Sequence, residues 1–194
     1  FEQEEKDKKD SDYAYEAYDK ALYFIDKREY EKALPYLEIA IKTDISSLKA
    51  WAYFQIGYCY VELKSYIKAI EAYKQAIRID PDDAIAHYNL GISYDQLGFD
   101  KDAIEAYKQA IRINPDYFLA YNNMGTIYGE LGNYTKAIEA FKQVIRINPD
   151  YANVHILLGY TYLLIGDKSL ALDEYKILKE LDIDLANELF DLIY

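Results

Sequence analysis

Three residues in this sequence carry side chains suited to nucleophilic or metal chemistry: Cys59, His87 and His155. One cysteine and two histidines 68 residues apart cannot complete the tetrahedral site that structural zinc prefers. Cys59 has no second cysteine for a disulfide, and we expect a buried, unreactive thiol there. The glycines never cluster into a phosphate-binding loop. We therefore expect no catalytic residue, no metal site, no cofactor and no enzymatic activity.

The charge balance narrows the choice of partner. The 194 residues include 22 Lys and Arg against 34 Asp and Glu, which gives a net charge of −12. Because nucleic-acid affinity depends on basic side chains that neutralise phosphates, we expect no nucleic-acid partner. The longest apolar stretch, roughly 156–165, is about half the length that a membrane helix needs, so we expect no membrane span. The compartment, cytoplasm or periplasm, stays open.

The elements that must position any functional residue repeat along the chain. Apolar residues within one period follow helical spacing, as in Ile56, Tyr60 and Leu63, so each period reads as a helical hairpin. We place these hairpins at 14–47, 50–83, 84–117, 118–151 and 152–185. Four sets of residues keep the 34-residue step: Ala69, Ala103, Ala137 and Ala171; Gly57, Gly91, Gly125 and Gly159; Tyr60, Tyr94, Tyr128 and Tyr162; Pro81, Pro115 and Pro149.

Turn residues agree with this period. Gly98, Gly132 and Gly166 follow the first helix of their hairpins, where a left-handed residue ends a helix at least cost. Each repeated proline lies just past a second helix, where a helix cannot continue. Lys64 stands at the position of a turn glycine, and a left-handed conformation there would carry strain of about 1 kcal/mol.

With these residues in place, the sequence resembles the tetratricopeptide repeat family. The resemblance implies an all-α fold: a right-handed α-solenoid of five helix-turn-helix units plus a short C-terminal capping helix. Small residues at Gly91 and Ala103 should lie where the helices of one hairpin meet, with Tyr94 and Tyr107 between that hairpin and the next. The third unit carries the family pattern as His87, Leu90, Gly91, Tyr94, Ala103, Tyr107, Ala110 and Pro115.

His87 and His155 have a structural interpretation within this repeat. Both occupy the aromatic position that Tyr53 and Tyr121 take in other units, so we expect packing with one polar contact rather than chemistry.

The two ends depart from the repeat. Residues 1–13 are mostly charged and read as a solvated tail or an extension of the first helix, with Asp12 as a candidate N-cap. Residues 186–194 hold apolar residues at helical spacing and read as a capping helix that follows a possible cap at Asp184.

The resemblance also implies a binding surface, because the first helix of each unit lines the concave side of such an array. None of the positions carried over is Lys or Arg, so the clamp with which some family members hold an acidic C-terminus is not expected. The surface is aromatic, apolar and mildly acidic. The residues that we expect to form this peptide-binding groove are Tyr18, Trp51, Phe54, Tyr58, Tyr88, Asn89, Asn122, Asn123, Thr126 and Tyr160.

Two features of this surface have alternative interpretations. One position in successive units holds Asp19, Gln55, Asn89 and Asn123, and the row ends at Leu157. The amide side chains of this row could bond the backbone of an extended peptide or only the neighbouring helices. The aromatic cluster could bind a partner or reflect the 23 tyrosines of the composition.

Two functions follow from these patterns. The first is a protein–protein interaction module, an adaptor or scaffold that binds an apolar, basic peptide or helical segment of a partner in its groove. The alternative is a self-assembling scaffold that forms homo-oligomers, because Leu189, Phe190, Leu192 and Ile193 make the last helix more apolar than a solubilising cap needs. Some scaffold members of the family self-assemble through terminal elements.

Overall fold

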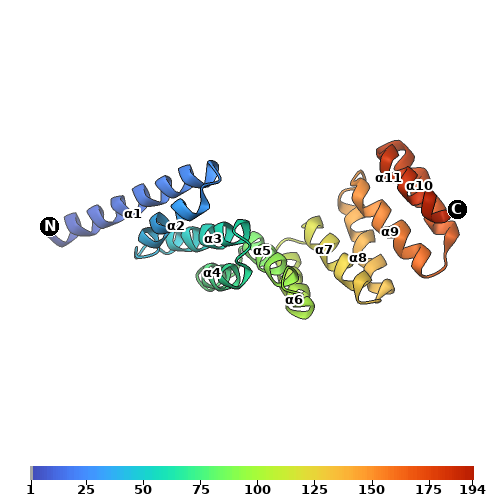
Figure 1. Cartoon of the computed structure of the whole chain (residues 1–194). Coiled ribbons are helices and arrows are strands. Elements are labelled where there is room, and N and C mark those ends of the chain that lie inside the picture. The colour runs from blue at the N-terminus through green and yellow to red at the C-terminus, as the bar shows by residue number, and fades with distance from the viewer. Residues whose placement is uncertain (1) are drawn as a thin grey trace. The chain divides into compact units, whose positions relative to one another are not determined.

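The computed structural model describes residues 2–194, with side chains from Lys9 onwards, and over this range it contains helices and no strand (Figure 1). The predicted all-α fold is confirmed. The helices are α1 (Glu2–Asp26), α2 (Tyr30–Ala40), α3 (Ser46–Glu62), α4 (Tyr66–Ile79), α5 (Ala84–Asp95), α6 (Asp100–Ile113), α7 (Phe118–Glu130), α8 (Tyr134–Ile147), α9 (Ala152–Leu164), α10 (Lys168–Leu181) and α11 (Ile183–Ile193).

The chain forms two compact units. The first ends at Ile113 and contains α1 to α6, and the second runs from Asn114 to Tyr194 and contains α7 to α11. In the first unit α1 packs on α2, α3 on α4 and α5 on α6, and the contacts of α2 with α3 and of α4 with α5 join these hairpins. In the second unit α7 packs on α8 and α9 on α10, while α11 contacts both α9 and α10.

The turns within hairpins have the backbone conformation that the sequence predicts. Gly98, Gly132 and Gly166 have φ angles of 72°, 73° and 82°. Arg28 and Lys64 adopt the same left-handed conformation, with φ angles of 59° and 56°, although both carry a Cβ atom. The strain expected at Lys64 is therefore present, at about 1 kcal/mol.

Glycines inside the first helices make room for aromatic rings. A Cβ atom added to Gly91 would lie 2.6 Å from Cε1 of Tyr107, and one added to Gly57 would lie 2.6 Å from the same atom of Tyr73. Both rings are fully buried. The ring of Tyr107 also fills the space above Gly91 of its own hairpin, a contact that the sequence analysis did not predict.

The end of the chain departs from this arrangement. A Cβ atom on Gly159 would lie 2.6 Å from Cδ2 of Leu189, so a side chain of α11 covers this glycine. Leu189 and Ala186 are fully buried, which makes α11 part of the core of the second unit.

Both N-cap expectations at the ends were wrong. The carboxylate of Asp182 accepts from the backbone N–H groups of Asp184 and Leu185 at 3.0 and 3.1 Å, so α11 begins earlier than the expected 186–194. Asp12 lies inside α1, which already begins at Glu2. Phe1, part of the expected tail, lies outside the described residues. No helix in the described range combines the length and apolar character that crossing a membrane requires.

Candidate functional site

The first helices of the first unit form one layer. α1 contacts α3, and α3 contacts α5. Trp51, Phe54, Tyr58 and Glu62 follow one another at three- and four-residue spacing, so they share one side of α3. We call this side, with the corresponding residues of α1 and α5, the inner face. It comprises Tyr15, Tyr18, Asp19, Trp51, Phe54, Gln55, Tyr58, Glu62, Ile85, Tyr88 and Asn89.

The predicted aromatic residues of the inner face differ in exposure. Trp51 is 52% exposed, and Ile85 at the same position of α5 is 54% exposed. Phe54 and Tyr88 are half-buried, because their rings lie 5.6 and 5.7 Å from the buried rings of Tyr73 and Tyr107. These two residues therefore support the core as well as the surface, whereas Trp51 projects an aromatic side chain that the core does not need.

Tyr58 belongs to a polar and aromatic group at the end of α3. Its ring meets that of Tyr30 edge-on, with centroids 6.0 Å apart and planes at 79°. The Tyr30 hydroxyl donates to Glu62 Oε2 at 3.0 Å. Desolvation, followed by the hydrogen bond to Glu62, raises the pKa of Tyr30 to about 12, so the phenol stays protonated and holds the carboxylate in place.

The amide row makes contacts within its own layer. Gln55 hydrogen-bonds Tyr18, whose pKa is raised by burial, and this contact links α1 to α3. Asn89 Nδ2 donates to the carbonyl oxygen of Ile85 in its own helix at 3.0 Å. These hydrogen bonds lie within the protein, as expected if the amides of this row have a structural role rather than a role in binding. The side-chain oxygen Oδ1 of Asn89 is then the atom that could accept from a peptide N–H.

The remaining predicted residues lie in the second unit. Asn122 Nδ2 donates to Asn123 Oδ1 at 3.3 Å, and Thr126 Oγ1 donates to the Asn122 carbonyl oxygen at 3.1 Å. Asn122 Oδ1 is buried without a hydrogen-bond partner. Tyr160 donates to Glu188 of α11, and burial followed by this bond raises its pKa to about 12. The C-terminal helix therefore engages Tyr160 in a way that the repeat pattern did not predict.

A buried pair in the last hairpin was also missed. His155 Nδ1 lies 2.7 Å from Glu174 Oε2, and its Nε2 donates to the carbonyl oxygen of Pro149 at 3.0 Å. His155 is 2% and Glu174 is 9% exposed. Burial is the largest single effect and lowers the pKa of His155, but the hydrogen bonds to Glu174 and Pro149 and the charges of Glu174 and Asp150 together outweigh it, so the pKa is raised. The pair could have been suspected from the sequence. Glu174 stands one 34-residue repeat after Ala140, so a carboxylate occupies the position that holds an alanine in the preceding repeat.

The other chemistry-bearing residues have structural roles. Cys59 is fully buried, and this burial raises the pKa of its thiol to about 12, far from a reactive thiolate. His87 places Nε2 3.1 Å from the Pro81 carbonyl oxygen, the contact that His155 makes with Pro149. Over the part of the chain that the structure describes, no three His, Cys, Asp or Glu residues lie together as a metal site would require.

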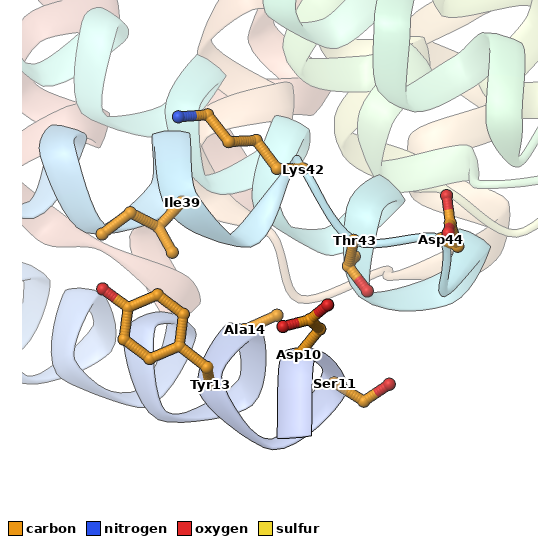
Figure 2. Close-up of a pocket in the computed structure, with 8 residues that line it drawn as sticks. All are labelled: Asp10, Ser11, Tyr13, Ala14, Ile39, Lys42, Thr43 and Asp44. Atoms are coloured by element: carbon orange, nitrogen blue, oxygen red, sulfur yellow. The ribbon is translucent and has the colours of Figure 1, made fainter. Parts of the chain in front are cut away.

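A cavity of about 450 Å³ lies between α1 and the end of α2, away from the inner face (Figure 2). Asp10 comes from α1, whereas Lys42 and Asp44 come from the segment that follows α2. The sequence did not indicate this cavity. Its lining residues are Asp10, Ser11, Tyr13, Ala14, Ile39, Lys42, Thr43 and Asp44.

Family models and solved structures match this chain. A model described as TPR repeat matches residues 57–98 and 94–132, and one described as tetratricopeptide repeat matches 118–151. No curated protein matches the sequence. The crystal structure of MamA is 26% identical and covers 86% of this chain and 96% of its own, with a TM-score of 0.79.

Two further structures show the same fold at lower identity. MamA from Desulfovibrio magneticus RS-1 is 20% identical and covers 89% of this chain and 97% of its own, with a TM-score of 0.81. YrrB, a TPR protein described as having an unusual peptide-binding site, is 24% identical and covers 90% of each chain, with a TM-score of 0.76. The helical arrangement thus resembles known repeat solenoids over most of its length.

Proposed function

This chain belongs to the tetratricopeptide repeat family, and we propose that it binds an apolar segment of a partner protein on the inner face of its first unit. The repeat fold is that of a protein–protein interaction module. Such a module acts by presenting side chains rather than by catalysis, so the question of function becomes which side chains the partner covers.

One observation carries the proposal: the exposure of Trp51. A tryptophan buries a large apolar area when a partner covers it, and tryptophan is among the residues that most often dominate binding energy. Here it is 52% exposed, beside the equally exposed Ile85 and half-buried rings at Phe54 and Tyr88. A protein gains no folding stability from the exposed half of such a ring, which favours a role in binding.

The test compares two exposed rings in the same unit. Trp51→Ala removes the ring of the inner face, and Phe99→Ala removes a ring of matching exposure, 51%, in the turn between α5 and α6. Both variants lose a partly exposed side chain, so each should change stability by only about 1 kcal/mol or less. Affinity capture from the source cells, quantified by mass spectrometry, then reports which proteins each variant retains.

We expect Trp51→Ala to lose partners that the wild-type protein and Phe99→Ala both retain. The same set of captured proteins with Trp51→Ala and Phe99→Ala would contradict binding on the inner face. Asn89→Ala tests the amide row. It removes the side-chain oxygen Oδ1 that an extended peptide would use, while the packing among α1, α3 and α5 is kept.

The polar residues of the second unit are a separate candidate surface for a bound segment. Asn122, Asn123 and Thr126 form a hydrogen-bonded group on α7, in which the buried Asn122 Oδ1 accepts no hydrogen bond from the described residues. Asn123→Ala disrupts this group and should weaken capture without a large loss of stability. Tyr160 contributes only if a partner displaces its bond to Glu188.

Self-assembly is the second candidate, and α11 favours it. Ile183 and Leu192 on this terminal helix are 56% and 58% exposed, and Tyr194, the residue that follows it, is 76% exposed. Deleting the helix would uncover the core through Leu189, so surface substitutions give the cleaner test. Ile183→Ser with Leu192→Ser should abolish any concentration-dependent rise in mass measured by light scattering. A wild-type protein that stays monomeric at high concentration would contradict this candidate.

A further inference from the structure

Lysine side chains cover five aromatic rings of the first unit that lie outside the inner face. Their ammonium groups lie between 4.4 and 6.0 Å from the ring centroids, within the range of a cation–π contact. The pairs are Lys20 with Tyr36, Lys27 with Tyr23, Lys32 with Phe24, Lys68 with Tyr60 and Lys74 with Tyr94.

The inner face lacks this cover. Over the described residues, no lysine or arginine of the chain lies above Trp51 or Tyr58, and no inner-face position holds a basic residue. Two carboxylates are present instead, Asp19 and Glu62. Asp19 lies near enough to Tyr18 to raise the pKa of its phenol, after the larger effect of burial. The face thus offers rings and negative charge without an internal cation.

The position of Glu62 strengthens this contrast. It is the last residue of α3, where the helix dipole is negative and a carboxylate is unfavourable. Asp26 ends α1 in the same way, whereas the second helices α4 and α6 carry Arg78 and Arg112 in their last turns. α1 and α3 therefore lack a favourable interaction that α4 and α6 have, and a bound cation would restore it at Glu62.

The chain does not neutralise Glu62 itself. Lys64 follows two residues later in the turn, yet among the described residues the carboxylate is hydrogen-bonded by Tyr30 and not paired with Lys64. Tyr30 also fixes Glu62 next to the edge-on pair of tyrosine rings. A carboxylate held beside two aromatic rings is the arrangement that recognises an arginine or lysine side chain.

We propose that the partner segment carries arginine or lysine side chains that lie over Trp51 and Tyr58 and pair with Glu62. The inference rests on the proposed function and specifies the chemistry of its partner. Trp51 and Glu62 lie eleven residues apart on α3, roughly 16 Å at a helical rise of about 1.5 Å per residue. The segment must therefore place apolar and cationic groups over that span, as an amphipathic helix with a basic side does.

The test uses Trp51 as its reporter, because it is the single tryptophan of the chain. The probe is a synthetic amphipathic peptide with leucine and arginine at helical spacing, compared with the same peptide in which citrulline replaces every arginine. Citrulline keeps the shape of arginine and removes its charge. We expect the arginine peptide to shift the Trp51 emission and the citrulline peptide to bind about tenfold more weakly or less.

A matched pair of variants separates local recognition from overall charge. Asp19→Asn with Glu62→Gln removes two charges from the inner face, and Glu71→Gln with Glu105→Gln removes two from the outer helices α4 and α6. The first variant should weaken the arginine peptide about tenfold and the second less than twofold. Equal weakening by both variants, or equal binding of the two peptides, would overturn the inference.

The outcome also distinguishes this inference from the proposed function. If both peptides shift the Trp51 emission equally, the inner face binds apolar segments without selecting cations, and only the present inference fails. If neither peptide changes the emission, a cationic amphipathic segment is not the partner, and the capture experiment with Trp51→Ala then decides whether the face binds at all.

Discussion

Replacing Glu174 by alanine removes the acidic partner of a histidine that has almost no contact with solvent. His155 is 2% exposed, and both ring nitrogens are engaged, one with Glu174 and the other with the Pro149 carbonyl oxygen. Removing one member of a buried pair leaves the other charged or polar group without a partner, at a cost of about 3–5 kcal/mol. We expect Glu174→Ala to lower the free energy of unfolding by about 3 kcal/mol at pH 6.

Two further variants isolate the pair. In the preceding hairpin of the same unit, Tyr121 and Ala140 stand where His155 and Glu174 stand in the last one. The double variant His155→Tyr with Glu174→Ala therefore installs a combination that this fold already accommodates, and we expect it to recover most of the loss. Asp173→Ala is the matched control, because its exposed carboxylate pairs only with Lys176 and should cost less than about 0.5 kcal/mol.

The same pair predicts a pH dependence. The folded state holds the His155 proton more tightly than the unfolded state, since its pKa lies above the ordinary value of 6.5. The stability that this adds is complete below that ordinary pKa and is lost as the pH rises through the raised, folded pKa. Urea unfolding followed by circular dichroism across a pH series measures the effect.

The wild-type protein should lose stability as the pH rises from the ordinary pKa of histidine through the raised pKa of His155. The double variant His155→Tyr with Glu174→Ala should not show this loss. Parallel pH profiles of the two proteins would refute the reasoning, as would a loss with Glu174→Ala no larger than that with Asp173→Ala. In either case the buried contact would contribute little beyond its packing.

Three more predictions concern packing and turns, and urea unfolding measures each. Tyr73→Phe should leave stability unchanged or raise it by up to about 1 kcal/mol, because the buried hydroxyl has no partner; a loss above 1 kcal/mol would reveal a hidden bond. Gly91→Leu should cost about 3 kcal/mol, since even a Cβ overlaps the buried Tyr107 ring; a cost below 1 kcal/mol would contradict the close contact. Lys64→Gly should stabilise by about 1 kcal/mol by relieving a φ of 56°, and a loss would show that the Lys64 side chain contributes more than its strain costs.

The helical architecture could be predicted because the same pattern of residue types recurs along the sequence. Each hairpin needs a small residue where its helices meet and a left-handed residue in its turn, and these requirements recur at a fixed step. The left-handed conformation at Lys64 was predictable for the same reason, since the position and not the residue type determines the backbone. Helix ends were less predictable, because Asp182 and Asp184 both suit an N-cap and only packing decides between them.

The sequence could assign the candidate residues to one side of a helix but could not predict their contacts. Periodicity placed Trp51 and Tyr58 on one side of α3, and the structure shows the first exposed and the second against Tyr30. Spacing within one repeat cannot reveal the Tyr30–Glu62 hydrogen bond, because it joins α2 to α3 across two hairpins. For the same reason the pattern did not predict that α11 would engage Tyr160.

The positions that depart from the repeat pattern are the most informative about the role of each part of the chain. In the last hairpin Tyr175 is only half-buried, and its ring is tilted against that of Phe190 of α11, with ring centroids 5.4 Å apart. Leu189 takes the place above Gly159. The terminal helix thus substitutes for an aromatic ring that the earlier hairpins supply themselves. Because that exchange ties α11 into the core, a partner or second copy that binds the end of the array must use the outward side of α11, at Ile183 and its exposed neighbours, rather than displace the helix.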